Sequence, residues 1–257
     1  MTPPPSHRPL LQVRALTRHF GGLNAVQDVN LEVADTGVHG LIGPNGAGKS
    51  TLINLLSGDL KPHQGRIVFQ GRDITSFGVA RTARLGIARS YQKSNIFGAL
   101  TCLENCWLGA LRHEAARAGI LPRPHTPERA RVRALEALGG VELSSRAETR
   151  GDALSHGERR QLEIAMLLTG APKLLLLDEP LAGLGPGESE NIVALIKALS
   201  AHRGIVLVEH DLDALFSLAD TVSVLESGKI LASAAPAAVR ADSAVRRAYL
   251  GRDTAAQ

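Results

Sequence analysis

The chain has 257 residues, of which 44% are hydrophobic, 21% are charged and only 3% are aromatic. This is the composition of an ordinary globular protein, whose core must consist mainly of Leu, Ile, Val and Ala. The formal net charge of +4 is too small to indicate nucleic acid by itself, and it suits an anionic ligand or a membrane-proximal surface equally well.

The first residues of the chain are rich in proline and have no apolar centre. Residues 1–9 therefore predict a disordered tail and not a signal peptide, and residues 10–257 are expected to form a single domain. A membrane-spanning helix needs an uninterrupted apolar run of about 18 residues, and the chain has none. The most apolar stretch, from Ala165 to Leu177, is broken by polar residues, glycine and proline. We therefore expect a chain that does not cross a membrane.

Short apolar runs alternate with helical patterns along the rest of the chain, which predicts an α/β fold with a largely parallel sheet. The predicted strands are Leu10–Leu16, Val29–Val33, Val38–Ile42, Ile67–Phe69, Ile87–Tyr91, Leu174–Leu177, Ile205–Val208 and Val222–Leu225. Predicted helices follow Gly48, span Leu103–Ala118 and Pro127–Leu138, run from Ser155 to about Thr169, and begin near Gly187, Asp211 and Pro236.

The stretch from about residue 94 to 170 contains no convincing strand. It predicts a helical insertion into the α/β core, with a Pro- and Gly-containing linker at Gly119–Thr126. Cys102 and Cys106 would lie on one face of a helix there. A metal pair is conceivable, but no second pair supports it, and buried structural thiols are the favoured interpretation.

A phosphate-binding motif stands between a predicted strand and a predicted helix. The residues Gly43-Pro44-Asn45-Gly46-Ala47-Gly48-Lys49-Ser50 match G-x-x-x-x-G-K-[ST] in full, and Thr51 continues into the helix. The glycines allow successive backbone N–H groups to face the phosphates at a helix N-terminus, whose dipole favours anions. Lys49 is expected to reach the β- and γ-phosphates, and Ser50 is expected to hold Mg²⁺. A Gly-rich turn with an exposed lysine is the weaker interpretation.

Gln92 follows the predicted strand that ends at Tyr91. Its amide could contact Mg²⁺ or the attacking water and then release that ligand. Without the other motifs, a single glutamine would indicate no function.

Leu154-Ser155-His156-Gly157-Glu158 precedes a strongly periodic helix. Ser155 and Glu158 have the spacing of a capping box, so the simple structural interpretation is a well-made helix start. A helix N-terminus that offers a serine hydroxyl and a glycine is also a site for an anion. Because this segment is expected to lie far from its own phosphate loop, the phosphate it binds would belong to another subunit.

The apolar run Leu174–Leu177 ends in two carboxylates, Asp178 and Glu179, followed by Pro180. A buried strand delivers them to the carboxyl edge of the sheet, where open α/β sheets bind ligands. Asp178 fits the acid on the Mg²⁺ side, and Glu179 fits the base that deprotonates the attacking water. Taken alone, the same residues could form a solvated turn.

His210 follows another apolar strand and could contact the γ-phosphate. Without the other motifs, it would be interpreted as a polar residue that begins the next helix.

The ordered set of Gly43–Thr51, Gln92, Leu154–Glu158, Leu174–Pro180, Leu181–Pro186 and His210 resembles the ABC transporter ATPases, and the resemblance covers about residues 10 to 251. It implies a P-loop NTPase core with a mixed N-terminal β region and an inserted helical subdomain. It also implies two ATP molecules sandwiched between two such domains, each phosphate loop facing the partner's Ser155 and Gly157. Phe20 matches the position that stacks on adenine.

Within this family the chain looks most like the ATP subunits of branched-chain amino acid uptake systems. The matching residues are Phe20-Gly-Gly-Leu-Asn-Ala-Val26, Leu181-Ala-Gly-Leu184, Leu207-Val-Glu-His-Asp211 and Ala248-Tyr-Leu-Gly251. The resemblance implies integral-membrane permease subunits, a second ATPase subunit that is the same or a related chain, an extracytoplasmic solute-binding protein that acts indirectly, and a place at the cytoplasmic face of the membrane. It implies no nucleic-acid partner. Segment Lys93–Leu100 is the expected permease contact.

Other assignments stay open from the sequence. Urea or short-amide uptake ATPases and the lipopolysaccharide-export ATPase are similar, and the non-transport ABC ATPases and P-loop kinases are the rival classes. Two positions depart from the family pattern: His156 replaces the commoner glycine, and Gly185 stands where many members have Asp or Asn.

Overall fold

The computed structural model describes residues 9–91, 95–118 and 126–247. Several predictions therefore fall wholly or partly outside it: residues 1–8 of the predicted tail at 1–9, Gln92, and the terminal Ala248–Gly251 motif. Most of the Gly119–Thr126 linker and the start of segment Lys93–Leu100 also lie outside the described residues.

Two sheets form the framework. The first has the order β2-β1-β4-β5, and its paired strands are antiparallel. It consists of β1 (Leu11–Phe20), β2 (Leu23–Val33), β4 (Gln64–Phe69) and β5 (Arg72–Asp73). The second has the order β10-β9-β3-β8-β7-β6 and is parallel except for its β9–β10 edge. Its strands are β3 (Gly37–Ile42), β6 (Ile87–Arg89), β7 (Leu174–Asp178), β8 (Gly204–Val208), β9 (Thr221–Glu226) and β10 (Lys229–Ala234). The predicted α/β fold is confirmed.

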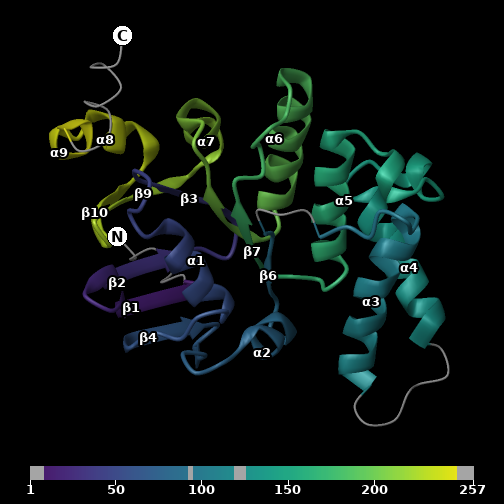
Figure 1. Cartoon of the computed structure of the whole chain (residues 1–257), viewed down its shortest axis with the longest axis horizontal. Coiled ribbons are helices and arrows are strands. Elements are labelled where there is room, and N and C mark those ends of the chain that lie inside the picture. The colour runs from purple at the N-terminus through teal and green to yellow at the C-terminus, as the bar shows by residue number, and fades with distance from the viewer. Residues whose placement is uncertain (1–8, 92–94, 119–125, 248–257) are drawn as a thin grey trace, which may run out of the picture.

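Helices cover both faces of the larger sheet (Figure 1). The segments are α1 (Lys49–Ser57), α2 (Val79–Arg84), α3 (Cys102–Ala118), α4 (Thr126–Gly139), α5 (His156–Leu168), α6 (Pro186–Ser200), α7 (Leu212–Leu218), α8 (Pro236–Ala241) and α9 (Ser243–Val245), with short 3₁₀ turns at Ser144–Arg146 and Gly151–Ala153. Helices α3, α4 and α5 stand together at one end of the molecule, away from the first sheet (Figure 1). None of the helices in the described ranges is long and apolar enough to span a bilayer.

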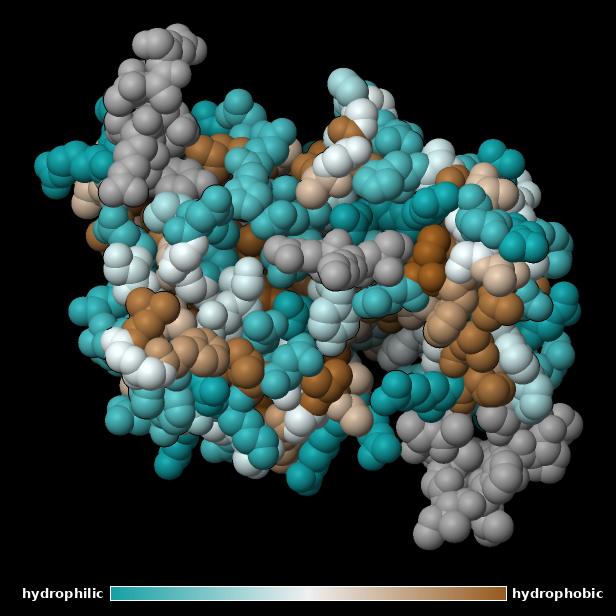
Figure 2. Space-filling model, viewed as in Figure 1, coloured by the Kyte–Doolittle hydropathy of each residue, from teal (hydrophilic) through white to brown (hydrophobic). Residues whose placement is uncertain are grey.

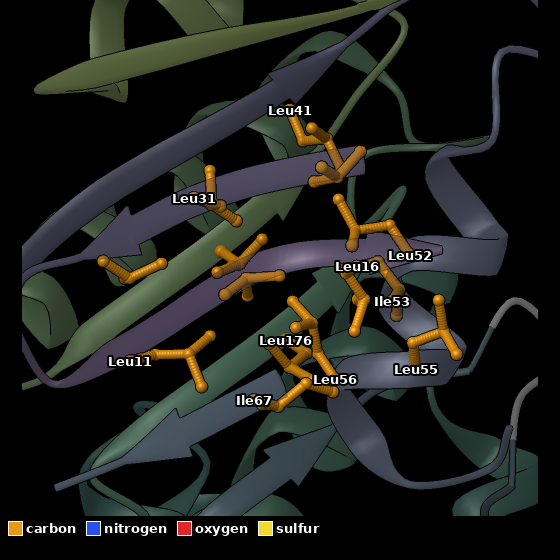
Figure 3. Packing of buried hydrophobic residues seen from close by; sticks show 14 of the residues in the cluster. Leu11, Leu16, Leu31, Leu41, Leu52, Ile53, Leu55, Leu56, Ile67 and Leu176 are labelled. Carbon is orange, nitrogen blue, oxygen red and sulfur yellow. The ribbon is translucent and has the colours of Figure 1, made fainter. Parts of the chain in front are cut away.

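One hydrophobic cluster joins the two sheets through α1. Leu52, Ile53, Leu55 and Leu56 of this helix are buried against β1, β4 and β7 (Figure 3). Burying a side chain of this size contributes about 1.5–3 kcal/mol, so this helix is held mainly by its packing. The cluster therefore fixes α1, and with it the loop that precedes it, against the carboxyl edge of β3.

A second cluster lies on the other face of the large sheet. It contains the buried thiols of Cys102 and Cys106 together with apolar residues of α4, α5 and α6. Burial raises the pKa of Cys106 to about 12, with a smaller contribution from Cys102. No cluster of metal-binding side chains occurs among the described residues. Both thiols are buried in the packing of the helical region.

Candidate functional site

The loop of residues 43–48 joins β3 to α1 and needs glycine at several positions. Gly46 has φ 79° and Gly48 has φ 107°, a region that other residues rarely adopt. A Cβ at Gly48 would lie 2.1 Å from the carbonyl oxygen of Ala25, whereas one at Gly46 would meet nothing within 4 Å. The start of β2 is thus pressed against the loop, and only a glycine at position 48 permits this approach.

Lys49 is the first residue of α1 and is buried. Its Nζ donates hydrogen bonds to the carbonyl oxygens of Gly43 (2.6 Å) and Pro44 (3.1 Å). Burial lowers the pKa of Lys49, and the nearby carboxylates of Glu179 and Asp178 oppose that shift. The ammonium group therefore lies against the backbone of the loop and within electrostatic reach of the two predicted acids.

Asp178 ends β7 and is 1% exposed. Its N–H donates to Ser90 Oγ (3.1 Å), and its Oδ2 lies 3.7 Å from a guanidinium nitrogen of Arg89. Burial raises the pKa of Asp178, and so does Glu179, while Arg89, Lys49 and His210 lower it. Its Oδ1 is buried and finds no hydrogen-bond partner within the described chain. An acceptor of this kind fits a cation or a water molecule bound to one.

Glu179 stands one residue beyond the strand, where the backbone turns to φ 52°. Its N–H donates to the carbonyl oxygen of Val208 (2.9 Å), so the turn remains attached to β8. Its Oε1 lies 2.8 Å from His210 Nε2. The predicted base and the predicted histidine, 31 residues apart in sequence, therefore form a direct hydrogen bond at the sheet edge.

The site contains two charged residues that could not be identified from the sequence motifs. Arg89 lies at the end of β6, and in the sequence only its position near a strand end could have indicated it. Glu209 is 3% exposed and accepts hydrogen bonds from Leu181 N (2.7 Å) and His210 N (3.3 Å). Burial raises the pKa of Glu209 to about 7, against the lowering effect of those two hydrogen bonds. It links the loop after Glu179 to the histidine.

Ser155 and Gly157 lie at the start of α5, on the other side of β7 from α1 (Figure 1). Ser155 Oγ accepts from Glu158 N (3.2 Å), and Glu158 Oε2 accepts from Ser155 N (2.9 Å). The predicted capping box is therefore confirmed. The structure does not bring these residues to the chain's own phosphate loop.

The remaining predicted site residues lie at the margins. Phe20 is 45% exposed at the tip of the β1–β2 hairpin, with the Arg18 guanidinium 4.8 Å from its ring centre. The same hairpin contacts the phosphate loop through Ala25. Asn45 is exposed on the loop, and Ser50 is exposed in the first turn of α1. Gln92 lies outside the described residues.

Comparison with known proteins agrees with this geometry. The family described as "ABC transporter" matches residues 26–182, and that described as "Branched-chain amino acid ATP-binding cassette transporter" matches residues 229–255. The chain is 37% identical to the high-affinity branched-chain amino acid transport ATP-binding protein BraF of Pseudomonas aeruginosa and 36% identical to LivG of Escherichia coli K12. Each alignment covers 95% of this chain and 98% of the relative. The lipopolysaccharide export system ATP-binding protein LptB of Acidithiobacillus ferridurans is 33% identical over 94% of this chain and 97% of its own length.

Solved structures give the same result. The crystal structure of an ATP-binding cassette of an ABC transporter in its ADP conformation superimposes with a TM-score of 0.82 at 29% identity, and the alignment covers 95% of this chain and 99% of that one. A bacterial ABC transporter cassette described as dimeric matches with a TM-score of 0.73 at 25% identity, over 88% of this chain and 98% of that one. The chain therefore belongs to the ABC transporter family, as one of its ATP-binding, ATP-hydrolysing cassettes.

Proposed function

We propose that this chain drives the import of branched-chain or other hydrophobic amino acids, as the ATP-hydrolysing subunit of an importer at the cytoplasmic face of the membrane. The observation that carries the cargo assignment is the match of residues 229–255 to the branched-chain amino acid family, together with the names of BraF and LivG. Its partners would be permease subunits, a second ATPase subunit of the same or a related chain, and, indirectly, a solute-binding protein.

The proposed chemistry follows from the residues at the sheet edge. The backbone of residues 43–48 and Lys49 would hold the triphosphate, with Phe20 against the adenine and Thr51 extending the loop into α1. Glu179 would take the proton of the attacking water, and His210, hydrogen-bonded to the Glu179 carboxylate, would orient that base.

Oxygen donors for Mg²⁺ are present at the same edge. Ser50 offers a hydroxyl, and Asp178 offers the buried Oδ1 that has no other partner in the described chain, so the donor set fits this cation. Gln92 is the third proposed contact. When bound, the ion would neutralise charge that develops on the phosphates.

The permease contact is proposed for an apolar groove of about 610 Å³ between α2, α3 and α5. Figure 2 shows the surface hollowed between α2 and α3. Its lining includes Val79, Ala83 and Met166, with Arg112 also contributing. Such a groove suits an amphipathic segment of a membrane protein that reaches out of the bilayer. Segment Lys93–Leu100, the contact expected from the sequence, stays a prediction.

The test is purification of the chain with its native membrane partners, followed by reconstitution and measurement of ATP hydrolysis with different solutes. Stimulation by leucine, isoleucine or valine is the expected result. Stimulation by urea or short amides alone would favour the related importer, and co-purification with nucleic acid or ribosomes in place of a membrane protein would favour a non-transport ATPase. A phosphorylated acceptor would indicate a kinase.

Variants separate the permease contact from catalysis. Ala83→Glu places a charge in the groove and is expected to abolish co-purification with the permeases while ATP hydrolysis by the isolated chain changes by less than about twofold. Leu231→Glu, on β10 at the opposite edge of the large sheet, is the control and should retain the permeases. Retention by both variants would contradict the groove assignment.

A further inference from the structure

Glu188, in the first turn of α6, contacts the N-terminus of α5. Its Oε1 accepts hydrogen bonds from Ser155 Oγ (3.1 Å) and from Gly157 N (2.8 Å). These are the two groups of this chain that the resemblance to the ABC transporter ATPases places against the nucleotide of the partner subunit. The Glu188 carboxylate of the same chain therefore accepts hydrogen bonds from the donors that are expected to bind a phosphate.

The contact is close because residue 157 is glycine. A Cβ at this position would lie 2.9 Å from both Cγ and Oε1 of Glu188. The two hydrogen bonds also lower the pKa of Glu188, with the Gly157 N–H as the largest contribution, so the side chain is held as an anion. A negative group at a helix N-terminus is stabilised by the unpaired N–H groups and the helix dipole.

The other oxygen of Glu188 accepts a long hydrogen bond within its own helix. Gly185 is the N-cap of α6 and has no side chain to cap the helix, and its N–H lies 3.4 Å from Glu188 Oε2. That distance is long for a hydrogen bond. The carboxylate of Glu188 therefore contacts the first turn of α5 with one oxygen and the N-cap of its own helix with the other.

We propose that Glu188 is an internal competitor of the nucleotide: its carboxylate holds the Ser155 and Gly157 donors in the single subunit and must be displaced by the triphosphate bound to a second copy or a related chain. Because the same hydroxyl and N–H cannot serve both anions, ATP-driven pairing has to break the Glu188 contact first. The inference rests on the proposed function, since it requires the second ATPase subunit proposed there and a nucleotide of that subunit bound by Ser155 and Gly157.

The test uses the full chain with Glu179→Gln, which is expected to bind ATP without hydrolysing it. Sedimentation velocity measures the ATP concentration at which half of the protein is dimeric. Glu188→Gln removes the charge and Glu188→Ala removes the competitor, and both are expected to lower this concentration by about two- to tenfold. Glu190→Gln, which removes an exposed carboxylate from the same helix, should shift it by less than about twofold.

The direction of the shift distinguishes this role from a structural one. If Glu188 merely stabilised α5 and α6, its replacement would lower the melting temperature and raise the ATP concentration needed. If the ATP concentration for half-dimerisation were unchanged or higher in both Glu188 variants, the inference would be overturned and the proposed function would remain intact. Absence of any ATP-dependent dimer, with Glu188 present or replaced, would instead contradict the proposed function on which the inference rests.

Discussion

At the scale of single residues, the site is a set of opposing charges held near the carboxyl edge of the large sheet. Lys49 and Asp178 are both buried, and each shifts the pKa of the other toward its charged form. Arg89 adds a second positive group at 3.7 Å from Asp178. Glu179 is more exposed and is held by His210, which leaves it accessible to water and oriented at the same time.

Replacing Glu179 by glutamine tests its role as base. The Glu179→Gln substitution keeps the size of the side chain but leaves a group that cannot accept a proton, so turnover is expected to fall by about 10²–10⁴-fold while ATP binding persists. Phosphate release measures the first effect, and titration with a fluorescent ATP analogue measures the second. A variant that hydrolysed ATP at the wild-type rate would show that another group is the base.

Glu209 gives the protein a pH dependence of stability. Its pKa is about 7 in the folded chain, above the value of 4.5 for an ordinary glutamate. Its contribution is therefore fully present below about pH 4.5 and is lost as the pH rises through 7, because the folded form then has to release the proton from a buried site. Glu209→Gln keeps an acceptor for Leu181 N and removes the titration.

Urea unfolding at pH 5 and pH 8 measures the effect. The wild type is expected to lose up to about 3 kcal/mol more stability between these two values than the Glu209→Gln variant does. Equal pH dependence of the two proteins would show that the pKa of Glu209 is the same in the folded and unfolded chains.

At the scale of elements, the packing of β2 against the phosphate loop decides which glycines are indispensable. Gly48→Ala would place its Cβ 2.1 Å from the Ala25 carbonyl oxygen, in addition to the strain of a positive φ. Gly46→Ala has the strain alone. Gly48→Ala is thus expected to lower the free energy of unfolding by at least about 1–3 kcal/mol more than Gly46→Ala, as measured by urea unfolding. If both variants lost the same free energy of unfolding, the chain would relieve the contact between residue 48 and the Ala25 carbonyl without an energetic penalty.

Elements with a strong apolar pattern could be predicted from the sequence. The buried runs of β3, β7 and β8 and the periodic α5 are where the sequence analysis expects them, and the parallel arrangement of the strands brings Asp178, Glu179 and His210 to one edge. Four elements were missed, namely β5, β10, α2 and α9. β10 is an edge strand without a buried residue, and α2 has polar residues without an apolar period, so neither carries the pattern that indicates burial. β5 and α9 are only two and three residues long.

Contacts between distant segments could not be predicted in the same way. Glu188 lies on a different element from Ser155, and its contact with α5 depends on how α5 and α6 pack. Glu209 is adjacent in sequence to His210, a predicted site residue. Its hydrogen bond with Leu181 N forms only because the loop after Glu179 lies beside the end of β8. Alternation and periodicity indicate which face of an element is buried, but they do not indicate which neighbour covers that face.

At the scale of the whole molecule, the two halves of the proposed chemistry lie apart. The phosphate loop belongs to the part of the chain that contains both sheets, and Ser155 and Gly157 belong to the group of helices at the other end (Figure 1). Two copies arranged about a twofold axis would place each phosphate loop opposite the partner's α5 and create two composite sites. A single chain is then expected to be a poor catalyst at any ATP concentration.

Mixing two inactive variants tests this claim most directly. Lys49→Ala disables the phosphate loop and Ser155→Arg disables the α5 donors, so each variant alone is expected to hydrolyse no ATP above background. In an equal mixture, half of the dimers would contain both variants and one intact composite site, which predicts recovery of about a quarter of the wild-type rate. A mixture that stays as inactive as its components would show that two copies of this chain do not complete each other's sites. A Ser155→Arg protein that is fully active on its own would contradict the account.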